Sequence, residues 1–408
     1  MQVSPKNSAI LDKMVVYSTL FPYFQPIPFP TDVQPLPFIF AILGVLLQIS
    51  NNSFKPIYNP ILLLIPISVL SFFISPILYG VEIFGLFQKS ITPVLLLALT
   101  IALRQSLVKF TVKDITIVTL IYLAAGIIEI FFRDLYVSVI PTFVNYKEMS
   151  FGLRGIRSIA PEPTDLGLVM FCLATIFEIK AIEERTSFIR IFIIRASIIL
   201  ILLASISTLS YLCLIIYLIY ITPNKLKIIY ITAPVLLYYF LPGALEVRAI
   251  DIIFGLITNP MEIVSNTSLF YRYIDTFAAV YYLNETLLLP TLHGSSTLAY
   301  PYLVSNSDIL GQFPNRTEFL LRMQLHPPEA FRNVISSLLI DYGVFGIAWL
   351  ASMIWAIFRR VALPFLFLVL AAFLIYVGQS FPLAFPPIFA LIGVALTNRQ
   401  RKAFHVER

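Results

Sequence analysis

The sequence predicts an all-α integral membrane protein with about twelve membrane-spanning helices. Hydrophobic residues make up 59% of the 408 residues, charged residues make up 12%, and the mean hydropathy is +0.88. A soluble domain carries roughly twice that charged fraction. The apolar residues also form runs of about 15–20, the length that crosses the hydrocarbon core of a bilayer. We therefore expect a single polytopic membrane domain over residues 1–408.

The apolar runs define the expected spans, and short polar or charged segments separate them. Four prolines between Pro22 and Pro30 interrupt the end of the first run. The polar stretch Ser205–Ser210 separates the seventh run from the eighth, so this turn is expected near the membrane boundary. The predicted spans are residues 14–29, 35–50, 60–79, 85–103, 115–132, 164–181, 190–206, 208–222, 227–242, 334–358, 361–378 and 380–397.

The basic residues support this number of spans. With both termini in the cytoplasm, the inside segments contain 18 of the 28 Lys and Arg residues but only 6 of the 22 acidic residues. Arg104, Arg359 and Arg360 are among the inside residues. Basic residues concentrate on the cytoplasmic side of membrane proteins, so the net charge of +6 indicates topology, and no nucleic-acid partner is expected.

Two long segments then lie outside the cytoplasm. Residues 133–163 form the first long periplasmic loop, and residues 243–332 form a larger one. The larger loop has helical patterns near 267–283 and 314–324, and we expect it to lie on the membrane face. Its tyrosines suit either sugar stacking or an interfacial aromatic belt.

Arginine on the outer side requires an explanation, because topology alone suppresses positive charge there. Eight of the ten basic residues outside are Arg. The planar guanidinium of Arg matches phosphate in a bidentate manner. Pairing with local acids is one explanation, and binding of an anionic ligand is the other.

Two outer segments contain most of the candidate site residues. In the first, Arg154 and Arg157 precede Glu162, which Pro161 and Pro163 hold in an extended stretch. The alternative for this segment is a helix start capped by Thr164 or Asp165. The second segment leads into the tenth predicted span, where a charged residue is costly unless paired or functional. Its candidates are Arg322, His326, Arg332, Asn333 and Asp341. Two further candidates, Arg248 and Arg272, lie earlier in the large loop.

No metal site or cofactor is expected. The three histidines are scattered, and both cysteines (Cys172 and Cys213) lie inside apolar runs. The chain has no HExxH, Walker A or GxSxG motif.

The two outer segments resemble those of bacterial O-antigen polymerases (Wzy-type), within the group shared with O-antigen ligases. Arg154-Gly155-Ile156-Arg157 followed by Glu162-Pro163 resembles a pattern in the first periplasmic loop of that group. Ligases share a His, then Asn, Ser or Gln, nine residues, and Gly-x-x-Gly, Thr or Tyr. Here Arg332 replaces the His, and Asn333, Gly343 and Gly346 fit. Arg332 and Gly343 also fit the Arg-(ten residues)-Gly pattern of polymerases, whereas Arg157 and Gly167 are one residue too close for it.

The resemblance implies a GT-C-like, metal-independent glycosyltransferase in the bacterial inner membrane. It would join oligosaccharide repeat units carried on undecaprenyl diphosphate at the periplasmic face, with a polysaccharide chain-length regulator as a partner. Glu162 is the first candidate for the base, followed by Asp341 and His326, while Arg157 and Arg332 stabilise the leaving diphosphate. Arg154, Arg272, Arg248, Arg322 and Asn333 are the substrate-binding candidates. The alternatives are an O-antigen ligase, a lipid-linked oligosaccharide flippase and a non-catalytic scaffold.

Overall fold

The computed structural model is all-helical, and no strand occurs among the residues that it describes. It describes residues 5–26, 33–50, 60–80, 82–144, 155–224, 227, 267–293, 296–306, 308–326, 333–379 and 382–397. The helices are α1 (Pro5–Leu20), α2 (Leu36–Ser50), η1 (Pro60–Leu63), α3 (Ile65–Tyr79), α4 (Ile83–Ser106), η2 (Leu107–Lys109), α5 (Val112–Phe131), α6 (Arg133–Val139), η3 (Ile140–Thr142), α7 (Pro163–Glu183), α8 (Phe188–Ala204), α9 (Thr208–Ile221), α12 (Thr267–Glu285), α13 (Ser296–Asn306), α14 (Ile309–Gln312), η6 (Pro314–Arg316), α15 (Thr317–Leu325), α16 (Val334–Tyr342), α17 (Val344–Arg360), α18 (Leu363–Gly378) and α19 (Pro386–Thr397).

Among the described residues, three segments are long and apolar enough to cross a membrane. They are Pro60–Tyr79, Gly85–Lys109 and Val112–Phe131. Their large apolar side chains reach solvent-accessible surface, with Phe73 67% exposed, Ile77 83% and Phe131 72%. Such apolar exposure on consecutive helices is what lipid contact requires. Shorter apolar helices cover Leu36–Ser50, Thr208–Ile221, Leu363–Gly378 and Pro386–Leu396.

The described helices overlap the predicted spans, with differences at the first span, at the tenth, and at the last, whose helix begins at Pro386. The first helix is α1, which begins nine residues before the predicted start and ends at Leu20. Its end precedes Pro22, which disfavours helical backbone at Phe21. The predicted span 227–242 lies outside the described residues, apart from residue 227. The full number of twelve spans stays a prediction.

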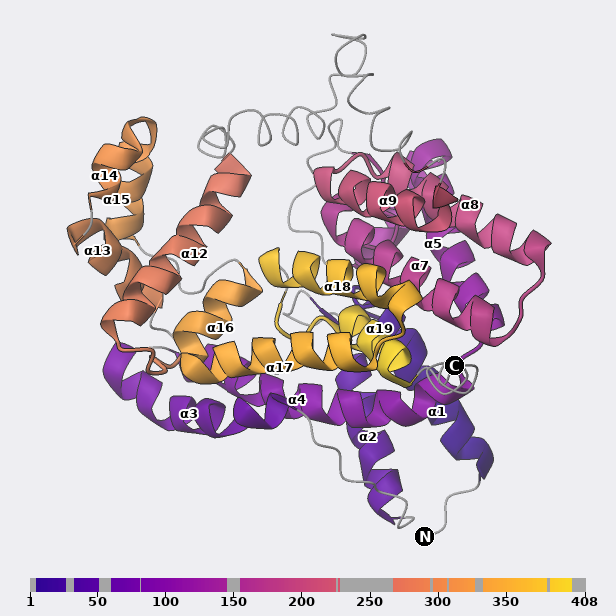
Figure 1. Cartoon of the computed structure of the whole chain (residues 1–408), viewed down its shortest axis with the longest axis horizontal. Helices are drawn as coiled ribbons and strands as arrows, with labels where there is room; N and C mark the ends of the chain where they lie inside the picture. The colour runs from indigo at the N-terminus through magenta and orange to yellow at the C-terminus, as the bar shows by residue number, and fades with distance from the viewer. Residues whose placement is uncertain are drawn as a thin grey trace.

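Helix α7 forms the centre of the packing. Every residue from Leu166 to Ala181 is buried, and α9, α18 and α19 pack against the helix (Figure 1). A helix that is buried on all sides is expected to be apolar all round, so its buried Glu178 requires a partner. The Arg195 guanidinium on α8 meets both Glu178 oxygens, at 2.9 and 2.7 Å, and Tyr217 of α9 donates to Glu178 at 2.7 Å. This network ties three helices together.

The predicted single span 334–358 is wrong, because the helix breaks at Gly343. This residue has φ 56° and ψ −133°, which separates α16 from α17. The N–H of Val344, just after the break, donates to the Leu288 carbonyl at 2.9 Å. A Cβ at position 343 would lie 2.6 Å from the Leu288 oxygen. Only glycine adopts this backbone conformation without strain. Because glycine is also common where membrane helices pack closely, its presence in the sequence did not by itself indicate a break.

A second apolar cluster lies over α16. Helices α12 to α15 gather at the upper left of Figure 1. Phe270, Tyr300 and Leu320 belong to this cluster, together with Leu339 and Ile340 of α16. The predicted helices near 267–283 and 314–324 are confirmed by α12 and α15. The large loop therefore has its own packed helices and rests on the helix that carries Asn333 and Asp341 at its ends.

We predict that Gly343→Ala lowers the thermal midpoint of the protein in detergent, by the equivalent of about 1–3 kcal/mol, because a β-carbon strains the backbone and meets the Leu288 carbonyl. Intrinsic fluorescence during heating measures this. Gly85→Ala is the control, since its backbone is helical and a β-carbon added there would have no atom within 4 Å. Equal midpoints for the two variants would contradict a required glycine at position 343.

Candidate functional site

The structure describes seven of the ten predicted site residues. Arg154, Arg248 and Arg332 lie outside the described residues. The others are Arg157, Glu162, Arg272, Arg322, His326, Asn333 and Asp341. They come from four elements: the segment before α7, α12, the end of α15, and α16.

The segment that carries Arg157 is held by a carboxylate from α5. One oxygen of Glu129, Oε2, accepts hydrogen bonds from the backbone N–H of Arg157 at 2.7 Å and of Ser158 at 2.8 Å. This one carboxylate oxygen satisfies two backbone N–H groups that would otherwise be costly to bury. The Arg157 side chain is itself buried, at 8% exposure. Glu129 thus fixes the backbone from which Arg157 projects.

Ser158 is held by two further hydrogen bonds. Its φ is 54°, a left-handed conformation that few non-glycine residues adopt. Its hydroxyl donates to the Tyr122 carbonyl at 2.6 Å, and its own carbonyl accepts from the Tyr136 hydroxyl at 2.6 Å. The surrounding bonds hold this strained backbone in place, as is common at ligand sites.

The polar turn between α8 and α9 packs against the same segment. Ile156 N–H donates to the Ala204 carbonyl at 2.9 Å. Gly155 has φ 77°, and a Cβ there would lie 2.4 Å from the Ser205 carbonyl.

Glu162 occupies the N-cap position of α7. Its φ and ψ are −138° and 154°, and Pro163 is the first helical residue, where proline is favoured. The alternative cap at Thr164 or Asp165 is wrong, since the helix already begins at Pro163. The Glu162 side chain makes no cap hydrogen bond and is exposed. Its carboxylate is therefore available to interact beyond its own helix.

Arg272 lies on α12, within the large outer loop. Its side chain is half-buried, and burial lowers the pKa of the guanidinium. The carboxylates of Glu162 and Asp275 act in the opposite direction and raise this pKa, so both lie within electrostatic reach. Arg remains charged under all ordinary conditions. A cation from the large loop thus lies within electrostatic reach of an acid from the first loop.

Asn333 connects this arginine to α16. Its side chain caps the helix by accepting from the Ser336 N–H at 2.7 Å. Its amide nitrogen donates to the Arg272 carbonyl and to Thr276 Oγ1, each at 3.3 Å. Asn333 is only 2% exposed, so it acts by positioning α12 against α16. Asn333 therefore contacts the backbone of Arg272, another of the predicted substrate-binding residues.

Asp341 at the other end of α16 has a histidine partner. Its Oδ2 lies 3.1 Å from Nδ1 of His293, which is 3% exposed. A carboxylate at Nδ1 favours the tautomer that leaves Nε2 as an acceptor. The Tyr342 hydroxyl lies 3.5 Å from Nε2 and 3.1 Å from Ser68 Oγ on α3. Ser71 Oγ accepts the His293 backbone N–H at 2.7 Å. The structure thus pairs Asp341 with a histidine.

His326 and Arg322 lie apart from both polar centres. Both are exposed at the end of α15, where the His326 N–H closes the last turn on the Arg322 carbonyl at 2.8 Å. Within the described ranges, no polar contact links either side chain to Glu162 or Asp341. The same ranges contain no group of three or more His, Cys, Asp or Glu that could hold a metal ion.

Two residues of these centres were not among the predicted ones. Glu129 lies inside the predicted span 115–132, and an acid within a span is a signal of function or pairing. His293 was one of two outer histidines, and sequence alone does not show that it meets Asp341, 48 residues away. Comparison with known protein families, curated proteins and solved structures finds no match to this chain.

Removing the Glu129 carboxylate is expected to release the Arg157 segment. Glu129→Ala leaves two backbone donors without their acceptor, so amide exchange over residues 155–160 should rise about tenfold or more. Hydrogen–deuterium exchange with mass spectrometry measures this. Glu82→Ala serves as the control, because the exposed Glu82 side chain makes no cap bond on α4. Unchanged exchange in Glu129→Ala would show that the carboxylate does not hold the segment.

His293 and Asp341 should be energetically coupled. In a double-mutant cycle with His293→Ala and Asp341→Asn, we expect a coupling free energy of about 0.5–3 kcal/mol from unfolding in detergent. The cycle of His326→Ala with Asp341→Asn is the control and should be additive, since His326 is exposed and away from Asp341. Additivity in both cycles would mean that the observed pair contributes no interaction energy.

Proposed function

We propose that this chain is a membrane glycosyltransferase that polymerises oligosaccharide repeat units carried on undecaprenyl diphosphate at the outer face of the inner membrane. The proposal is supported by the placement of Arg272, whose carbonyl accepts a hydrogen bond from Asn333 and whose guanidinium lies within electrostatic reach of Glu162. It joins a phosphate-binding residue type to a carboxylate from a different loop. The sequence resemblance to O-antigen polymerases supplies the substrate class.

The proposed step needs a base and a stabilised leaving group. A hydroxyl of the acceptor attacks the anomeric carbon of the donor and gives its proton to Glu162. The bond from that carbon to the diphosphate oxygen breaks, and undecaprenyl diphosphate leaves with the electron pair. Arg272, with Arg157 and Arg332, would stabilise the charge that develops on the diphosphate. This assignment requires no metal ion.

An aromatic row on α12 suits the glycan. Tyr273 stacks on Phe277 with ring centroids 6.0 Å apart, and Phe277 stacks on Tyr281 at 6.3 Å. Tyr302 of α13 contacts Tyr281 at 6.0 Å. Residues four apart share one helical face, so these three rings form a row along α12 that begins one residue after Arg272. Sugar rings can lie against such faces, and the row would then guide the chain away from the site.

An O-antigen ligase is the second candidate, on the spacing of Asn333, Gly343 and Gly346. Polymerase and ligase would share the donor site and differ in the acceptor. Arg332 in place of the ligase histidine favours the polymerase. A chain-length regulator remains an expected partner of the polymerase.

In-vitro polymerisation tests the proposal. Purified protein is mixed with lipid-linked repeat units in EDTA, and the products are separated on a gel. We expect a ladder from the wild type and a loss of roughly 100-fold or more in Glu162→Ala, Arg272→Ala, Arg157→Ala and Arg332→Ala. Arg316→Ala is the control, because Arg316 packs on the Phe270 ring and has no assigned role.

The acceptor distinguishes the remaining functions. Transfer that appears only when lipid A core is added would make the protein a ligase. No transfer to either acceptor by the folded wild type would reject the glycosyltransferase and leave the flippase or scaffold.

A further inference from the structure

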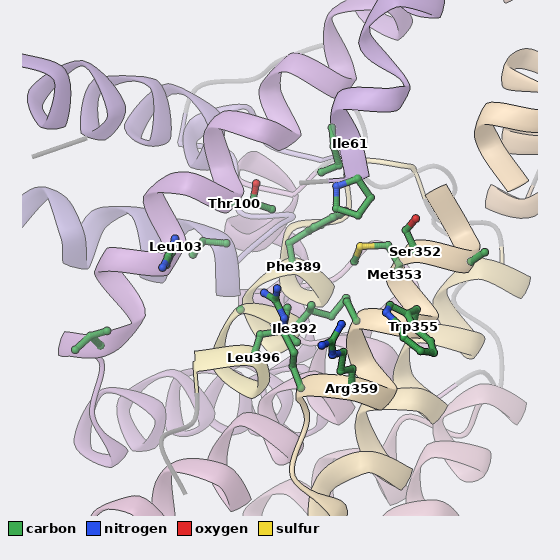
Figure 2. A pocket seen from close by; sticks show the side chains of 17 residues that line it. Ile61, Thr100, Leu103, Ser352, Met353, Trp355, Arg359, Phe389, Ile392 and Leu396 are labelled. Carbon is green, nitrogen blue, oxygen red and sulfur yellow. The ribbon is translucent and has the colours of Figure 1, made fainter. Parts of the chain in front are cut away.

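A second feature of the molecule is a cavity of about 1070 Å³ between α4, α17 and α19, with η1 at its edge. Figure 2 shows Arg359, Ile392 and Leu396 facing the same space, together with Trp355 of α17. The topology predicted from the basic residues places this cavity on the inside, away from Glu162 and Arg272. It has no role in the proposed transfer.

Three arginines line the cavity, and no acid does. Arg104 comes from α4, and Arg359 and Arg360 come from the end of α17. All three are exposed, and no ion pair to any of them occurs in the described part of the chain. Four other basic residues predicted to be inside do have acidic partners, namely Lys13 with Asp114, Lys109 with Asp12, Lys180 with Glu183 and Arg195 with Glu178. Three gathered guanidinium groups repel each other, and a bound anion removes that repulsion.

The rest of the wall is apolar. Ile61, Leu103, Phe389, Ile392 and Leu396 contribute to it. Trp355 also lines the cavity and is 65% exposed, as is typical of tryptophan at a membrane interface. A small anion would make no contact with the apolar wall, and a hydrocarbon would provide no negative charge to pair with the arginines. The combination fits a molecule with a negative headgroup and long acyl chains.

We propose that this cavity binds an anionic phospholipid of the inner leaflet. Its phosphate pairs with Arg104, Arg359 and Arg360, and an acyl chain lies along the α19 wall. Basic pockets between membrane helices on the cytoplasmic side bind such headgroups in this way. Lipids with a net-neutral headgroup carry an ammonium that the three arginines repel. The site goes beyond the proposed function and does not depend on it.

The two tryptophans of the chain provide the test. Trp349 is fully buried, whereas Trp355 lies in the cavity wall, so brominated acyl chains bound there quench Trp355. The protein is reconstituted into phosphatidylcholine nanodiscs that contain either brominated phosphatidylglycerol or brominated phosphatidylcholine at the same mole fraction. We expect phosphatidylglycerol to be preferred about fivefold or more, from the attraction of an anionic headgroup to these arginines. Trp355→Phe should abolish the difference.

Charge-matched variants locate the site. Arg104→Ala with Arg359→Ala should reduce the preference to near one, and Arg104→Lys with Arg359→Lys should retain most of it. Lys113→Ala with Arg190→Ala is the control, since both are exposed inside residues away from the cavity. Equal quenching by the two brominated lipids in the wild type would overturn the proposal, as would equal loss in the control. Relief of the quenching by millimolar inorganic phosphate would identify a phosphate site in place of a lipid site.

Discussion

The outer site depends on the Glu129 carboxylate, which accepts two backbone N–H groups from the segment before α7. A segment that leaves the helical state near a bilayer must find partners for its backbone, because lipid offers none. Glu129 and the Tyr136 hydroxyl supply them at Arg157 and Ser158. With this backbone fixed, Glu162 enters α7 at a set position.

Positions of the helices could be predicted because apolar length is a local property of the chain. Span 85–103 became α4 and span 190–206 became α8 within a few residues. The break at Gly343 was missed because it depends on the Leu288 carbonyl, 55 residues earlier in the chain. The pairs of the site were missed for the same reason. Glu129 meets Arg157, and His293 meets Asp341, only through tertiary packing, whereas the sequence shows each residue without its partner.

The spaced pattern that suggested a family has a structural explanation at each described position. Asn333 caps α16, Gly343 provides a positive φ, and a Cβ on Gly346 would lie 2.2 Å from the Leu338 carbonyl. These residue types are thus required by the turn from α16 to α17, whatever chemistry occurs nearby. The proposed choice between polymerase and ligase rests on position 332, where Arg stands in place of the ligase histidine. A spacing motif can therefore report a backbone geometry without reporting a reaction.

The two candidate sites differ in whether their arginines have acidic groups nearby. This difference matches the ligand that each site would bind. Arg272 is half-buried and has Glu162 and Asp275 within electrostatic reach, so part of the desolvation cost of its guanidinium is offset before any ligand arrives. Such a site would suit a diphosphate that must leave after each transfer. The two acids would stabilise the Arg272 guanidinium again once the diphosphate had left. Arg104, Arg359 and Arg360 are exposed and have no acidic partner in the described ranges. Nothing there competes with a bound anion, and an unopposed cluster of this kind favours a ligand that stays.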